Sequence, residues 1–386
     1  MPIDVAQAVR DTITLVQIDS QNPGALEGAC ARWVRQRLEY AGIDVMTQAV
    51  QPGRDNIVAR VQGTGTGPRL VLLAHMDTVP VGDGWTVPAL EGLTRNGRIY
   101  GRGAADMKSG LAVAINLMAA LARESAPPRE VILCATVDEE GPQMAGAHAL
   151  VAADIVTPDD QVLALEPTGL RLRIAQVGLR WMELTVQGRM AHAGRAHLGI
   201  DANHVMARVV ERLKEQVAAL PYRDDMLGRP LFTCGTLRGG IATNVVPPSC
   251  HAQFDVRLVP PMTTADAEAL VRSVVEEVLP AFPGAGYALR GLGAARPPIH
   301  AAADCHLIEH LRDAYLSVVG RPLESGGADG HEAYTDASMI AALTGSRSCT
   351  VFGPGSSDHA HTADEFVPIS DIEHAAGVLE HMIECW

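Results

Sequence analysis

A chain of 386 residues is longer than one hydrophobic core usually serves, so its length predicts two domains. With 47% hydrophobic and 20% charged residues it has an ordinary globular composition, and no apolar run reaches the roughly 20 residues of a membrane span. The formal charge of −14 argues against nucleic acid or an anionic membrane as a partner. The opening stretch MPIDVAQAVRDTITLVQ lacks a secretory pattern and the seven cysteines are widely spaced, so we expect reduced thiols and a cytoplasmic protein.

The elements expected between residues 1 and 176 alternate between helices and apolar strands. Helical periodicity predicts helices over about 4–19, 27–41 and 109–123. Strand-like runs lie at RLVLLAH (69–75), EVILCATV (130–137), QVLALE (161–166) and, late in the chain, SCTVFG (348–353). Near-continuous apolar strands that alternate with helices indicate an α/β domain whose mixed sheet is sandwiched by helices.

The middle of the chain follows a different order of elements. We expect a strand at 179–188, a helix at 201–220, strands at 231–239 and 249–259, a helix at 264–279 and a strand at 287–291. This β-α-β-β-α-β order is the ferredoxin-like pattern. The sequence therefore predicts a catalytic domain formed by residues 1–176 and 293–386, interrupted by an inserted α+β domain over 177–292.

Residues able to bind metals follow the apolar strands. His75 and Asp77 end one strand in HMDTVP, Glu139 and Glu140 follow the next in DEEG, and Glu166 ends a third in LALEPTG. In open α/β sheets, ligands bind where the strands end. Because residues i and i+2 of a strand face the same side, we expect the Asp77 carboxylate to accept a hydrogen bond from the ring of His75 and to fix its orientation.

Two further motifs extend this set. Asp106 lies in the glycine-rich GRGAADMKSG before a helix, and His361 lies in AHTADEFV, where His359 competes with it. Taken singly, a histidine at a strand end is more often structural and an acidic residue before a helix is more often a cap. The recurrence of such residues at strand ends favours a metal site. Asp138 has no metal role in this scheme, and we expect it to shape its loop.

The motifs HMDTVP, GRGAADMKSG, DEEG and AHTADEFV, in this order and spacing, resemble the co-catalytic dinuclear zinc amidohydrolases and peptidases. That family includes acetylornithine deacetylase, succinyl-diaminopimelate desuccinylase, aminoacylase and glutamate carboxypeptidase, and the resemblance covers essentially the whole chain. It implies two Zn²⁺ per chain, one bound by His75 and Glu166, the other by Glu140 and His361, with Asp106 bridging them. It also implies that Glu139 is the general base, that Asp77 orients His75, and that the inserted domain is a lid through which the protein forms a homodimer.

Elementary chemistry agrees with this resemblance. Two cations about 3.5–4 Å apart share a bridging carboxylate, and imidazole and carboxylate ligands without thiolate suit zinc, with cobalt or manganese as substitutes. A water between the cations is acidified and still needs a base to take its proton. We expect this water to cleave the amide bond of an N-acyl-L-amino acid, such as an acetylornithine-like compound. The alternative is a dipeptidase or carboxypeptidase that removes a C-terminal residue, because both reactions use the same residues.

Substrate contacts are expected from the inserted domain and from a late loop. The resemblance implies that His192, in GRMAHAG, reaches the substrate carbonyl across the dimer, and that Asn244 and Arg257 hold the substrate, often by its carboxylate. For Arg257 a structural ion pair is the alternative. Two candidate loops follow: SGGADG (325–330) resembles a shortened desuccinylase run, and YTDA (334–337) resembles the deacetylase branch. We expect Thr335 and Asp336, from the second of these, to lie near the substrate.

Two competing interpretations carry less support. HLIEH (306–310) spells the motif of single-metal proteases, yet the apolar positions around it predict a helix with both histidines on a solvated side. A binding protein without enzymatic activity would have lost a ligand or the base, whereas every expected position is filled.

Overall fold

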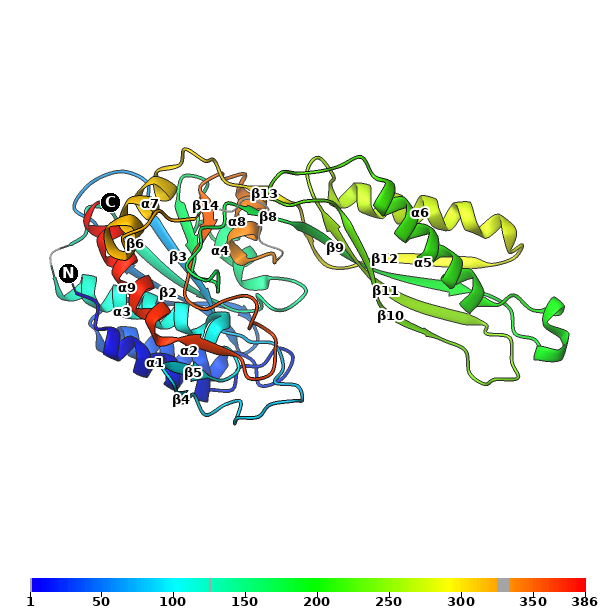
Figure 1. The fold of residues 1–386 in the computed structure, drawn as a ribbon, viewed down its shortest axis with the longest axis horizontal. Helices are drawn as coiled ribbons and strands as arrows, with labels where there is room; N and C mark the ends of the chain where they lie inside the picture. Colours follow the sequence, from blue (N-terminus) through cyan, green and yellow to red (C-terminus); the bar gives the residue numbers. More distant parts are fainter. Residues whose placement is uncertain (1, 125, 325–332) are drawn as a thin grey trace. The chain divides into compact units, whose positions relative to one another are not determined.

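The computed structural model describes residues 2–124, 126–324 and 333–386, and this part of the chain divides into two compact units (Figure 1). The first unit is built from the chain before Gln176 and after Ile299. The second is built from Gln176–Ile299, to which Ala333 and Tyr334 also belong.

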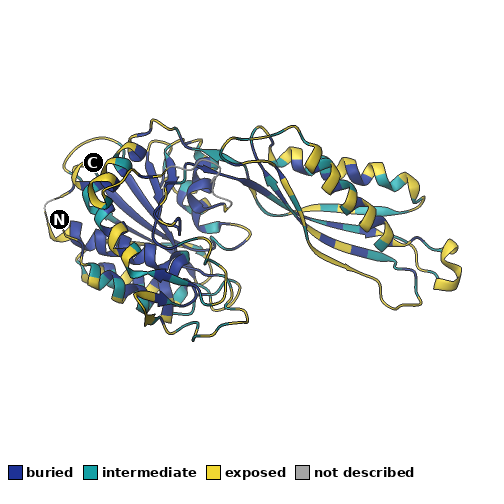
Figure 2. Ribbon diagram, in the orientation of Figure 1, coloured by how far each residue is buried: buried dark blue, intermediate teal, exposed yellow. Residues whose placement is uncertain are grey.

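A mixed sheet forms the centre of the first unit, with the strand order β1-β2-β6-β3-β7-β14. Its strands are β1 (Val45–Gln51), β2 (Arg54–Val61), β3 (Leu70–His75), β6 (Val131–Thr136), β7 (Gln161–Ala164) and β14 (Cys349–Val351). The last four are parallel, while the β1–β2 hairpin is antiparallel and pairs with β6 through β2. Every residue of those four strands is buried, which is why they read as continuous apolar runs (Figure 2). The predicted α/β class is confirmed.

Helices cover both faces of this sheet. α2 (Gly28–Tyr40) and α3 (Ser109–Arg123) pack on one face, and α4 (Ala145–Ala152) and α8 (Asp336–Thr344) pack on the other. Outside α3 lie α1 (Val5–Gln17) and α9 (Ile369–Glu384), and α7 (His306–Val319) packs against α9. The segment Ala104–Arg123 has the length and hydropathy of a membrane span, but 94% of its 18-residue apolar window is buried inside the protein, as in the core helix of a globular unit.

Short elements bring distant segments of the first unit together. A π-helical turn, Ala104–Lys108, leads into α3, and the Asp106–Met107 peptide bond within it is cis. A small antiparallel sheet pairs β4 (Leu93–Arg95), β5 (Arg98–Tyr100) and β15 (Phe366–Pro368) in the order β15-β5-β4. The pairing of β5 with β15 places the segment that follows His361 beside the loop that leads to Asp106. Two short strands, β8 (Ala175–Gln176) and β13 (Ile299–His300), pair where the chain leaves the first unit and returns to it.

The second unit is an antiparallel sheet with the strand order β10-β11-β9-β12, packed against two helices. Its elements are β9 (Gly178–Gln187), α5 (Ala202–Ala219), β10 (Leu231–Gly239), β11 (Ser249–Leu258), α6 (Thr264–Val278) and β12 (Gly286–Arg296), with 3₁₀ turns at Ala193–Leu198 and Leu279–Ala281. α6 begins with a capping box between Thr263 and Asp266. The expected face of α5, which includes Val205, Val209 and Leu213, is buried in the core, and the ferredoxin-like order is confirmed.

Candidate metal centre

His75 is the last residue of β3, and its ring is buried at the carboxyl edge of the sheet. Its Nδ1 lies 2.9 Å from the backbone carbonyl oxygen of Asp77 and 3.7 Å from Oδ1 of the Asp77 carboxylate. The prediction that the carboxylate accepts the ring hydrogen bond is therefore wrong: the main chain of Asp77 accepts it. The strand ends at His75, so the alternation of side chains does not continue to Asp77.

The Asp77 carboxylate is buried and holds the neighbouring loop instead. Its Oδ1 accepts the backbone N–H of Glu139 at 3.2 Å, and its Oδ2 accepts that of Glu140, also at 3.2 Å. The side chain of Asn22 donates to the same Oδ2 at 2.9 Å. Through these three hydrogen bonds Asp77 connects the end of β3 to the loop after β6 and to Asn22.

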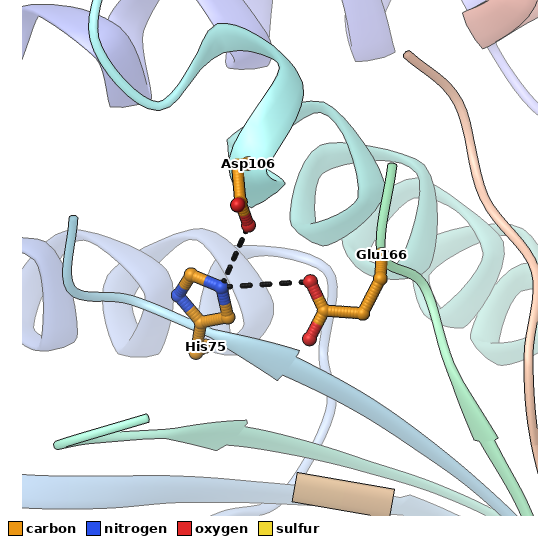
Figure 3. A group of neighbouring side chains, drawn as sticks. All are labelled: His75, Asp106 and Glu166. Atoms are coloured by element: carbon orange, nitrogen blue, oxygen red, sulfur yellow. Dashed lines mark hydrogen bonds and ion pairs between the residues drawn. The ribbon is translucent and has the colours of Figure 1, made fainter. Parts of the chain in front are cut away.

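Asp106 lies between the two histidines. Its Oδ1 is 3.1 Å from Nε2 of His75, and its Oδ2 is 3.4 Å from Nε2 of His361 (Figure 3 shows the first contact). The backbone N–H groups of Ala105 and Asp106 donate to Oε1 of Glu365 at 2.9 and 3.0 Å. Since each oxygen of Asp106 faces a different histidine, this one carboxylate has the geometry of a bridge between two sites.

Three glutamates lie next to the two histidines of the cluster. Oε2 of Glu166, which follows β7, lies 3.6 Å from Nε2 of His75 (Figure 3), while Oε2 of Glu139 lies 4.0 Å from the same atom. On the other side, Oε1 of Glu140 lies 2.9 Å from Nε2 of His361. The ion-pair contact of Glu139 is thus with His75, and that of the adjacent Glu140 is with His361.

Three groups of ligand atoms that lie within 4.8 Å of one another occur among the described residues: His75, Asp106 and Glu166; Asp106, Glu140 and His361; and His75, Glu139 and Glu140. The first two groups share Asp106 and have the composition of the two ligand sets expected from the sequence. Each offers one imidazole and two carboxylates without a thiol, a donor set suited to zinc, cobalt or manganese. The residues fit a pair of divalent cations.

The charges of the cluster favour the same conclusion. Burial alone would lower the pKa of His75, but the charges and hydrogen bonds of Glu166 and Asp106 raise it well above its ordinary value. Hydrogen bonds to Asp106 and Glu140 raise the pKa of His361 to about 10. Burial would raise the pKa of Asp106, yet its hydrogen bonds to both histidines lower it. Both pKa shifts result from the negative charge gathered around the two rings, and this charge favours the binding of cations.

Three other carboxylates have a raised pKa, opposite to the lowered pKa of Asp106. Burial raises the pKa of Glu166 to about 7 and that of Asp77 to about 7. Burial also raises the pKa of Glu139 well above its ordinary value, and the negative charges of Glu166 and Glu140 add to this effect. These shifts are those of crowded, desolvated carboxylates, and added cations would reverse them.

His192 and Asn244 lie close to each other in the second unit. The backbone of His192 forms a β-bridge with Val245, and the N–H of Ala193 donates to the carbonyl of Asn244 at 3.0 Å. Both side chains are exposed, and Nδ1 of His192 accepts the N–H of Gly194 at 3.0 Å. The structure thus brings these two predicted residues together on adjoining loops.

Arg257 lies on β11, where its Nη2 contacts Oδ2 of Asp255 at 2.9 Å. Trp181 donates to the same carboxylate oxygen from its indole N–H at 3.2 Å. The ion-pair alternative for Arg257 therefore has a specific partner, although about a third of the Arg257 side chain stays exposed.

Thr335 and Asp336 open α8 in the first unit, and both are buried. Oγ1 of Thr136, the last residue of β6, donates to Oδ2 of Asp336 at 2.6 Å. The negative charge of Asp336 contributes to the raised pKa of both Glu139 and Glu166. Asp336 thus lies close to the cluster, while the other candidate loop, 325–330, is outside the described residues.

The HLIEH histidines do not form a metal site. In α7 the apolar Leu307 and Leu311 are buried, whereas the His306 side chain is 70% exposed. His310 packs against Trp386. Neither histidine belongs to a group of metal-ligand atoms in the part of the chain that the structure describes.

Several residues around the cluster were missed in the sequence. Glu365 is fully buried, forms an ion pair with Arg102 and holds the backbone at Asp106. Both residues stand inside motifs that had been singled out, AHTADEFV and GRGAADMKSG, so their place next to a ligand was the available signal. Asn22 and Arg54 lie far from any such motif, and the sequence gives no signal for them.

Comparison with known proteins gives a consistent result. The sequence profile of peptidase family M20/M25/M40 matches residues 71–384. A probable succinyl-diaminopimelate desuccinylase of Staphylococcus epidermidis is 27% identical, with 93% of this chain and 92% of the relative covered, and an acetylornithine deacetylase of Myxococcus xanthus is 30% identical, with 98% of each covered. Among solved structures, a metallo-carboxypeptidase of Sulfolobus solfataricus superposes with a TM-score of 0.82 at 17% identity over 98% of both chains, which is a likeness of fold.

Proposed function

Because the chain belongs to peptidase family M20/M25/M40, a family of metal-dependent amide hydrolases, we propose that it removes the acyl group from an N-acyl-L-amino acid. The observation that carries the proposal is the pair of ligand groups that share Asp106. One group adds His75 and Glu166, and the other adds Glu140 and His361. We propose that each group holds one Zn²⁺, which cobalt or manganese could replace.

When bound, the two cations would acidify a water molecule and polarise the carbonyl of the scissile amide. The residues of the chain have distinct tasks around them. Asp106 spans the two groups, and the backbone carbonyl of Asp77 fixes the ring of His75 through the 2.9 Å contact to Nδ1, so that Nε2 faces the site.

Glu139 is the proposed general base. Its neighbour Glu140 already contacts His361, whereas the Glu139 carboxylate stays 4.0 Å from His75 and is free of a hydrogen bond to that ring. A carboxylate in this position can accept a proton from water and later deliver it to the leaving amine.

Support for deacylation comes from the relatives of comparable length. Proteins that share 27–30% of their residues with this chain are named desuccinylase and deacetylase, and the products of both kinds of reaction are amino acids. We propose that Arg257 and Asn244 hold the carboxylate of the substrate, since a guanidinium binds a carboxylate through two parallel hydrogen bonds. Thr335 and Asp336 are proposed to contribute near the substrate.

The test is a panel of N-acetyl and N-succinyl amino acids and dipeptides, offered to the zinc-loaded protein, with the released amine measured by chromatography. We expect turnover of acyl amino acids to exceed that of dipeptides by about tenfold or more, and Glu139→Gln to lower it by ~10²–10⁴-fold in the same preparation. Hydrolysis of dipeptides alone would instead establish the peptidase alternative. Absence of any amide hydrolysis in a protein with two zinc ions bound would refute the proposal.

The homodimer, the action of His192 across it and the cytoplasmic location stay predictions.

A further inference from the structure

Behind the ligands lies a group of charged and polar side chains, three of them buried, to which the mechanism gives no task. It consists of Asn22, Glu27, Arg54 and Asp138, here called the Arg54 clamp. Glu27 is fully buried, and Arg54 and Asp138 are 8% and 3% exposed. An ion pair with so little access to water gains little net stability, because desolvation offsets its Coulomb attraction. Net stability therefore does not explain why this ion pair lies beside the metal-ligand cluster.

The planar guanidinium of Arg54 holds the clamp together with a fork of hydrogen-bond donors. Arg54 donates from Nε to Oε2 of Glu27 at 2.8 Å and from Nη2 to Oε1 of the same carboxylate. A third donor, Nη1, reaches Oδ1 of Asp138 at 3.1 Å. Glu27 also accepts the backbone N–H of Asp138 at 3.1 Å. The guanidinium therefore fixes two carboxylates at once, which a lysine could not do with the same geometry.

Asp138 links Arg54 to Asn22, because its carboxylate accepts a hydrogen bond from each of them. It sits at a φ of +65°, a strained conformation for a residue with a side chain, and its Oδ2 accepts the N–H of Ala145 at 3.2 Å. Its Oδ1 faces Nδ2 of Asn22 at 3.1 Å, and the same nitrogen lies 2.9 Å from Oδ2 of Asp77. Between two carboxylates only the NH₂ end of the carboxamide fits, since its carbonyl would meet negative charge on both sides.

Asn22 is thus the member of the clamp that contacts Asp77. Asp77 in turn holds the backbone N–H groups of Glu139 and Glu140. We propose that the Arg54 clamp is a positioning device that sets the direction of the Asp77 carboxylate, and thereby keeps the side chains of Glu139 and Glu140 pointing to different sides of the centre. The inference rests on the proposed roles of those two glutamates.

A matched control lies at the amino end of β3, whereas the cluster lies at its carboxyl end. Arg69 forms the same kind of fork with Asp160, at 2.7 Å from Nε to Oδ1 and 2.6 Å from Nη2 to Oδ2. Arg69 stands just before β3, whereas His75 ends it, so this fork lies one strand length from the centre. Arg54→Lys and Arg69→Lys are therefore the same substitution in two similar forks, of which only one adjoins the cluster.

The experiment compares Asn22→Ala, Arg54→Lys and Arg69→Lys in the full-length protein. It measures the visible absorption spectrum of the Co²⁺ form, the affinity for Zn²⁺ by calorimetry, Tm, and kcat and KM on whichever substrate the wild type hydrolyses. We expect both lysine variants to lower Tm. Only Asn22→Ala and Arg54→Lys should change the Co²⁺ spectrum and lower Zn²⁺ affinity or kcat by ~10–100-fold, the usual effect of losing a residue that orients the ligands, with KM nearly constant.

Wild-type Co²⁺ spectra, Zn²⁺ affinity and kcat in Asn22→Ala would overturn the inference, and so would equal losses in Arg69→Lys. Asn22 is only half-buried, so its alanine variant keeps the test decisive if Arg54→Lys fails to fold. The Co²⁺ and Zn²⁺ titrations need no substrate. A wrong choice of substrate class would therefore leave their outcome unaffected, and the two proposals can fail separately.

Discussion

Replacing Glu139 by Gln removes one charge and one proton acceptor while the shape of the side chain is kept. The backbone N–H of Glu139 still donates to Asp77 at 3.2 Å, and the carboxylate is 4.0 Å from Nε2 of His75, so the amide loses no hydrogen bond to that ring. The fold should be nearly unaffected. Loss of a general base costs ~10²–10⁴-fold in kcat, which corresponds to about 2.7–5.4 kcal/mol of activation free energy.

The assay measures kcat together with the zinc content of the purified variant. We expect two zinc ions per chain in Glu139→Gln and a kcat lowered within that range. Glu140→Gln is the control, because it weakens the 2.9 Å contact to His361 in a proposed ligand group and should lower the zinc content. If Glu139→Gln loses zinc yet turns over near-normally once reloaded, Glu139 is a ligand in the third group, with His75 and Glu140, and the base is another residue.

Three further results are expected. Asp106→Ala should empty at least one metal site, because this residue belongs to two of the ligand groups, and two zinc ions retained per chain would contradict its bridging role. Gly141→Ala should destabilise the protein by about 1–3 kcal/mol in urea unfolding, since a Cβ at 141 would lie 2.0 Å from Oδ1 of Asp138; an unchanged midpoint would show that the loop moves freely. The metal-free protein should lose stability between about pH 6.5 and 10, because the raised pKa of His361, about 10, gives stability that is present below its ordinary value and lost as the proton leaves. Tm values of the metal-free and zinc-loaded forms, measured from pH 6.5 to 9.5, should therefore diverge as pH rises, and parallel curves would refute this reasoning.

The strands that carry ligands were predictable from the sequence because they are buried on both faces. β3, β6 and β7 read as apolar runs, and the polar residues after them mark the sheet edge. The β1–β2 hairpin was not predicted. β1 lies at the sheet edge and all of its residues are exposed or half-buried, so VMTQAVQ carries no apolar pattern that would distinguish it from a loop.

The contacts around the site were predictable only between residues that stand inside the recognised motifs. The contact between His75 and Asp106 joins motifs whose residue types already indicated metal chemistry. Asp138 shows the limit: its sequence position suggested a loop residue, but its charge is used by Arg54, 84 positions away. Pairings over such separations depend on how β2 and β6 are placed side by side, and one sequence carries no pattern for that.

The order of the ligands along the chain means that the ligand groups are completed at different times during synthesis. His75, Asp106 and Glu166 are all translated before the inserted unit begins, whereas His361 is made only after that unit is complete. The edge strand β14 also comes late, so the sheet that carries Glu166 gains its last neighbour near the end of translation. A chain that stops anywhere between these points has the complete group of His75, Asp106 and Glu166 but lacks His361 of the other group. Truncated products are therefore expected to compete for metal ions without acquiring the two-ion centre that the whole chain supports.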